Sequence, residues 1–88
     1  MVVKMFDIKE KIYELEKILD LEARSYRPMQ SVIDMHFDGD EDRARLFFYA
    51  LGVFQRGFIA KQELYELANM AGATRGLVNS LLARMGLQ

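Results

Sequence analysis

LYELANMAGATRGLVNSLLARM, residues 64–85, is the most informative segment of this 88-residue chain. Ala68 and Gly72 stand four residues apart, and Thr74 and Val78 follow them. A helix-turn-helix needs a small residue where its second helix crosses the first, and glycine at the turn, where the backbone adopts a positive φ. It also needs a Ser or Thr cap to start the second helix and apolar residues to fix its angle. The spacing therefore predicts a helix-turn-helix.

The segment resembles the helix-turn-helix of bacterial repressors, most closely that of the lac repressor type. The residues that carry the resemblance are Leu64, Tyr65, Glu66, Leu67, Ala68, Ala71, Gly72, Ala73, Thr74, Val78 and Asn79. In that family the motif opens the chain and a sugar-binding domain follows it. Here the motif closes the chain, and we expect no wing or effector domain after it.

The resemblance implies that the helix opening at Thr74 lies in the major groove of DNA, with its amino-terminal side chains at the edges of the bases. Five residues match the outward positions of such a recognition helix, and one on the preceding helix matches a supporting contact. They are Thr74, Arg75, Gly76, Asn79 and Ser80, supported by Tyr65.

The charges of this segment agree with DNA binding locally, because residues 67–88 contain no Asp or Glu. Arg75 could pair with guanine and Asn79 with adenine, each contributing roughly 1–3 kcal/mol of discrimination. Contacts with phosphates would come from Arg84, Lys61, Arg56 and Arg45, with Gln62 at a helix start. This set is small and the net charge is −1, so we expect weak, salt-dependent binding per subunit, which a dimer would strengthen.

Helical spacing continues on the amino-terminal side of the motif. Residues 7–26 read as an amphipathic helix, with Asp7 as its N-cap. Its predicted apolar face comprises Ile8, Ile12, Leu15, Leu19 and Tyr26, widened by Ile18 and Leu21.

The middle of the chain predicts two more helices, at residues 28–37 and 41–57. Between them, Gly39 is suited to a left-handed helix end and Asp40 to the cap of the next helix. The helix over 41–57 is apolar almost all round, so it should be buried on more than one face. Gly52 within it indicates a close helix crossing.

Together with helices at 61–70 and 74–85, these segments predict an all-α domain of five helices over residues 1–88. Its carboxyl-terminal part, residues 41–88, would form a tri-helical helix-turn-helix unit without a wing. Residues 1–40 would supply the scaffold and the contact of a homodimer.

Composition argues against most enzyme classes. The chain has no Cys and a single His, which excludes disulfides, thiol nucleophiles and multi-histidine metal sites within one chain. No catalytic constellation is visible, so we expect no enzymatic activity and no cofactor. The chain shows no secretory signal and no apolar run long enough to span a bilayer, which predicts a cytoplasmic protein without a membrane partner.

One acidic run could suggest calcium binding. Asp34, Asp38 and Gly39 fit an EF-hand register, but His36 occupies the third position and Arg45 stands where a bidentate Glu is required. We therefore predict no metal site and interpret these acids as a helix end followed by an acidic helix start.

The sequence thus favours a small DNA-binding protein, a transcriptional regulator that reads the major groove as a homodimer. The alternative is a non-catalytic module that binds another protein through the same architecture. In that case the small residues Gly76, Ser80 and Ala83 would let a partner helix approach the last helix closely. Salt dependence separates the two, because only DNA binding should weaken steeply as salt rises.

Overall fold

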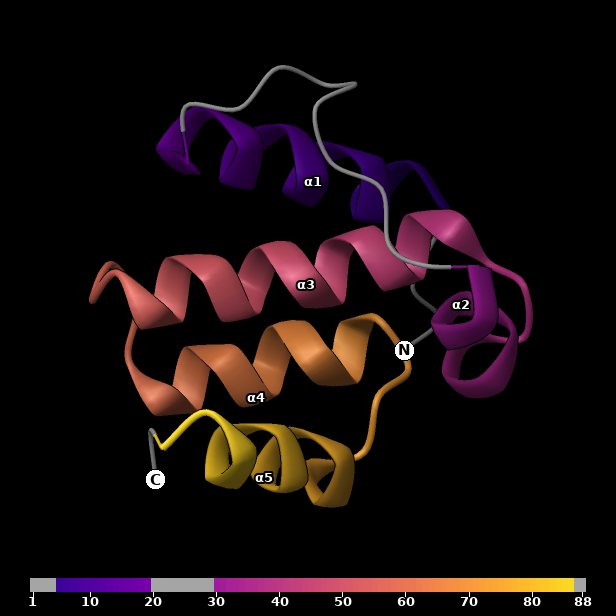
Figure 1. Cartoon of the computed structure of the whole chain (residues 1–88). Helices are drawn as coiled ribbons and strands as arrows, with labels where there is room; N and C mark the ends of the chain where they lie inside the picture. The colour runs from indigo at the N-terminus through magenta and orange to yellow at the C-terminus, as the bar shows by residue number, and fades with distance from the viewer. Residues whose placement is uncertain (1–4, 20–29, 87–88) are drawn as a thin grey trace.

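A computed structural model describes residues 5–19 and 30–86 of the chain, and over these ranges it contains helices and no strand. The all-α prediction is confirmed, and Figure 1 shows the arrangement of the helices. The helices are α1 (Met5–Leu19), α2 (Gln30–Phe37), α3 (Glu41–Gln55), α4 (Lys61–Met70) and α5 (Arg75–Arg84).

The predicted helix bounds are most accurate in the carboxyl-terminal half. α4 matches its predicted range to within one residue, and α5 follows its predicted cap. α3 ends at Gln55, two residues before the predicted end, because Gly57 adopts a φ of +79° and its N–H returns to the Phe54 carbonyl. The predicted residues 20–26 and 28–29 lie outside the described ranges.

α1 buries the predicted apolar stripe. Ile8, Ile12, Leu15 and Leu19 are each 6% exposed or less. Two details were wrong. Asp7 follows two residues that are already helical, so it lies inside α1 and is not the N-cap. Ile18 is 43% exposed, since it projects beyond the stripe that meets α3. The predicted positions Leu21 and Tyr26 fall outside the described residues.

α3 is the central helix of the fold. It packs against α1, α2 and α4, while α5 packs on α4 (Figure 1). This confirms the expectation that its apolar side chains are covered on more than one face. The buried residues of α3 are Ala44, Leu46, Phe47, Tyr49, Ala50, Leu51 and Val53.

α1 and α3 run in the same direction, so that their carboxyl ends meet (Figure 1). A Cβ added at Gly52 would lie 3.5 Å from Leu19 Cδ2, which places this glycine at the α1–α3 crossing, as predicted. At the same end, Arg56 Nη1 donates a hydrogen bond of 3.2 Å to the Leu19 carbonyl. This contact ties the loop after α3 to the last described turn of α1.

Gly39 and Asp40 have their predicted roles at the junction of α2 and α3. Gly39 has a φ of +80°, and its N–H bonds to the Ile33 carbonyl. Asp38 also takes a positive φ of 51°, which the sequence did not indicate, although Asp tolerates this conformation better than most residues. The Asp40 side chain accepts a hydrogen bond from the Arg43 N–H and caps α3.

Candidate nucleic-acid interface

The turn between α4 and α5 follows a defined hydrogen-bond pattern. The Gly72 N–H bonds to the Asn69 carbonyl at 3.0 Å, and the Ala73 N–H bonds to the Ala68 carbonyl at 2.8 Å. This pair of bonds is the Schellman motif, which requires a left-handed residue at its centre. Gly72 fills that position with a φ of +86°. The predicted turn residue is therefore present in the predicted conformation.

Small residues and a threonine cap complete the turn. Ala68 is 1% exposed, as expected of the residue at which two helices cross closely. The Thr74 hydroxyl accepts a hydrogen bond of 3.1 Å from the Leu77 N–H and caps α5, as predicted. Val78 and Leu82 are fully buried and fix the inner face of α5. The arrangement is a helix-turn-helix with α5 as its second helix.

Four of the predicted site residues gather around the Tyr65 side chain, between α4 and the first half of α5. The Arg75 guanidinium carbon lies 4.5 Å from the centre of the Tyr65 ring, within the range of cation–π attraction. The Tyr65 hydroxyl donates a hydrogen bond of 2.5 Å to Asn79 Oδ1. Lys61 Nζ lies 6.0 Å from the same ring centre. Tyr65 of α4 thus contacts the predicted base-reading residues of α5 and holds them in place.

The remaining predicted site residues lie in three places: in a hollow between α4 and α5, on the exposed side of α5, and at the end of α5. Gln62, Thr74 and Arg75 line one hollow together with Tyr65. Gly76 and Ser80 are exposed on the outer side of α5. Arg84 is exposed in the last turn of α5, which puts it about 13 Å along the helix from the start at Arg75.

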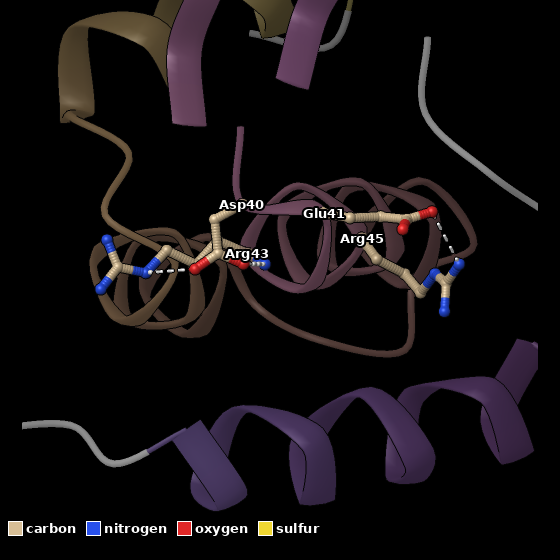
Figure 2. A network of polar contacts seen from close by, with 4 residues as sticks. All are labelled: Asp40, Glu41, Arg43 and Arg45. Atoms are coloured by element: carbon tan, nitrogen blue, oxygen red, sulfur yellow. Dashed lines mark hydrogen bonds and ion pairs between the residues drawn. The ribbon is translucent and has the colours of Figure 1, made fainter. Parts of the chain in front are cut away.

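Two arginines expected to contact phosphate are engaged within the chain. Arg45 Nη2 lies 3.4 Å from Glu41 Oε1, and the Arg45 side chain is only 22% exposed (Figure 2). Arg56 donates to the end of α1, as described above. A sequence shows the charge of these residues, but their partners come from helix packing.

Sequence reasoning missed two charged residues near the turn. Arg43 forms an ion pair with Asp40, with 3.4 Å between Nε and Oδ2 (Figure 2). Its Nη1 would lie 3.6 Å from a Cβ at Gly72, so this guanidinium stands beside the turn. Glu66 lines the same hollow as Arg75 and adds a negative charge there. The spacing of Asp40 and Arg43 predicts their pairing, but only the tertiary fold brings Arg43 to the turn.

The amide of Asn79 is more constrained than the sequence suggested. A bidentate contact with adenine uses the amide oxygen as acceptor and the amide nitrogen as donor. Tyr65 already donates to that oxygen. Tyr65 therefore both orients Asn79 and competes with a base for it.

Comparisons with protein families, curated proteins and solved structures find no match to this chain. Within residues 5–19 and 30–86, no group of three or more acidic or histidine side chains is arranged to hold a metal ion. None of the helices described has the length and apolar character needed to cross a membrane.

Proposed function

We propose that this protein binds double-stranded DNA as a homodimer and acts as a transcriptional regulator, with α5 entering the major groove. The observation that carries the proposal is the α4–α5 turn, in which Gly72 and Thr74 set α5 against α4 in a helix-turn-helix. The outer side of α5 is exposed, and residues 67–88 carry no acidic side chain that would repel phosphate.

The Tyr65 cluster supports base reading by α5. Stacking on the Tyr65 ring holds the Arg75 guanidinium at the amino end of the helix. A guanidinium held in this way loses less conformational freedom when it pairs with guanine. Because the positive end of the helix dipole lies at the same place, a phosphate group near Thr74 would be stabilised as well.

Few exposed cations are available to contact phosphate, and this number sets the affinity that we expect of one subunit. Arg75, Lys61 and Arg84 are exposed, whereas Glu66 opposes them beside the hollow. One subunit should therefore bind weakly, and two subunits would double the contacts. A homodimer would read two half-sites about 34–36 Å apart.

A comparison of two cation-on-tyrosine pairs tests the proposal. Arg75→Ala removes the cation from Tyr65, and Lys17→Ala removes the cation that lies 4.4 Å from the Tyr13 ring centre on α1. Both variants lose one positive charge and one stacking contact. Binding would be measured by fluorescence anisotropy on a random-sequence duplex pool, followed by selection of bound sequences. We expect Arg75→Ala to lose base preference at one position and Lys17→Ala to bind like the wild type.

Salt provides the second measurement. Affinity should fall steeply between about 50 and 200 mM salt, and Arg84→Ala should weaken all sequences alike and flatten that dependence. An affinity that is unaffected by salt, or an Arg75→Ala variant with unchanged preference, would contradict groove binding by α5.

The alternative function is protein binding through the outer side of α5, without catalysis. Gly76, Ser80 and Ala83 are all exposed and lie at spacings of four and three residues, which places them along one side of the helix. Small side chains allow another helix to approach closely. Such an interface would give chemical-shift changes along α5 with a protein partner, and these would persist at high salt.

A further inference from the structure

A second surface adjoins the first and lies between α4 and α1. These two helices flank α3 (Figure 1) and leave a groove of about 320 Å³ between them. The groove is apolar inside and charged at its edges. Its apolar lining comprises Leu15, Ile18, Ile59, Leu67 and Met70, and its charged edges carry Lys11, Glu14, Glu63 and Glu66.

The apolar lining is only partly covered. Ile18 is 43% exposed, and Ile59, Leu67 and Met70 are half-buried. Phe58, which precedes Ile59 in the chain, is 60% exposed. A contiguous apolar strip of this kind loses its contact with water when a partner covers it, and this favours association.

The charges at the edges select the partner. Lys11 pairs with Glu14 at 3.2 Å, so these two charges largely cancel. Glu63 and Glu66 are exposed one turn apart on α4, and neither forms an ion pair among the residues that the structure describes. Three carboxylates and one cation line the groove, so it carries a net negative charge beside an apolar strip, although Glu66 also borders the hollow of Arg75.

This combination disfavours several occupants. DNA and an anionic membrane would be repelled by Glu63 and Glu66. A second copy docked by the same groove would bring the same carboxylates face to face. A helix with an apolar stripe flanked by Lys and Arg matches both the strip and the charges.

We propose that the groove between α1 and α4 binds a basic amphipathic helix of a partner protein. The occupant would lie along α4, whose ten residues span about 15 Å, or nearly three helical turns. The partner's apolar side chains would cover Ile18, Leu67 and Met70, and its cations would pair with Glu63 and Glu66. This proposal does not depend on DNA binding, which would use the neighbouring side of α4; the two surfaces share Glu66, whereas Glu63, Leu67 and Met70 line the groove alone.

The test uses the full chain and two synthetic peptides. The probe is a peptide of roughly 14 residues made of leucine and lysine, with leucine at helical spacing. The control peptide has glutamate at every lysine position. We expect the lysine peptide to bind and to shift the amide resonances of Ile59, Leu67 and Met70, and the glutamate peptide not to bind.

Matched variants separate the groove from general charge attraction. Glu63→Gln with Glu66→Gln removes the two unpaired carboxylates and should weaken lysine-peptide binding by roughly five- to tenfold, because partly exposed ion pairs are modest. Asp34→Asn with Asp38→Asn removes two exposed carboxylates elsewhere and should leave binding unchanged. Ile18→Lys, at a partly exposed site, should weaken binding through the apolar strip. Circular dichroism would confirm that each variant is folded.

Four results would overturn the proposal. They are equal binding of both peptides, shifts confined to another surface, equal losses in the two double variants, and concentration-dependent shifts at the groove without peptide. The last of these would identify a second copy as the occupant.

Discussion

α1 and α3 meet through large apolar side chains, whereas α4 and α5 meet through small residues and a defined turn. The fully buried large side chains of the first pair include Ile8 and Tyr49. At the second junction, Ala68, Ala71 and Ala73 are buried, and Gly72 and Thr74 set the direction of the chain. The first pair is held by area removed from water, and the orientation of the second is set by backbone hydrogen bonds.

Truncating the central aromatic side chain should have the largest effect on stability. Phe47 is 1% exposed, and its ring centre lies 5.5 Å from that of Phe37 and 5.3 Å from that of Phe48. Phe47→Ala should lower the free energy of unfolding by about 3–5 kcal/mol, because it leaves a cavity where α2 meets α3. Phe58→Ala, at a residue that is 60% exposed, is the control and should cost less than about 1 kcal/mol. Urea denaturation measures both. Equal losses would mean that burial around α3 does not dominate stability.

Replacing either of two glycines of the helix-turn-helix by alanine should change the stability, but in opposite directions. Gly72→Ala forces a side chain into a φ of +86° and should cost roughly 1–2 kcal/mol. Gly76 lies within α5, and its added Cβ would meet nothing closer than Thr74 Oγ1 at 3.7 Å. Gly76→Ala should therefore stabilise the fold by up to about 1 kcal/mol. Thermal unfolding of the two variants would show whether each is more or less stable than the wild type. A lower stability of both would mean that the space around the added methyl group, rather than the backbone conformation, decides the effect.

Removing the cap of α5 should have the smallest effect of the three. Thr74→Ala deletes the hydrogen bond from the Leu77 N–H and should cost about 1 kcal/mol. Ser80→Ala removes an exposed hydroxyl from the same helix and should change stability by less than about 0.5 kcal/mol. Amide hydrogen exchange of α5 would show the cap effect locally. If the exchange rates of α5 are unchanged and those of α1 increase, the prediction that Thr74 stabilises the start of α5 is wrong.

The same contrast explains how much of the fold could be predicted. Turn and cap signals are local, so Gly72, Thr74, Gly39 and Asp40 took their predicted roles. The cap of α1 was misplaced, because an Asp is also tolerated inside a helix and the sequence alone did not separate the two positions.

The candidate interface was predictable only in part. Arg75, Asn79 and Tyr65 were identified separately, but their mutual contact depends on the angle between α4 and α5. The engagement of Arg56 with the end of α1 depends on packing between residues far apart in the chain. A sequence pattern indicates which residues carry charge, and the tertiary fold decides which of those charges remain available.

The parallel packing of α1 on α3 also bears on the order of folding. The Arg56–Leu19 contact closes a loop across 37 residues, whereas the Tyr65–Asn79 contact closes one across 14. Closing the longer loop costs about 0.9 kcal/mol more in chain entropy. The α4–α5 junction can therefore form at low entropic cost before distant contacts exist. We expect α3, α4 and α5 to assemble first and to provide the surface onto which α1 docks last.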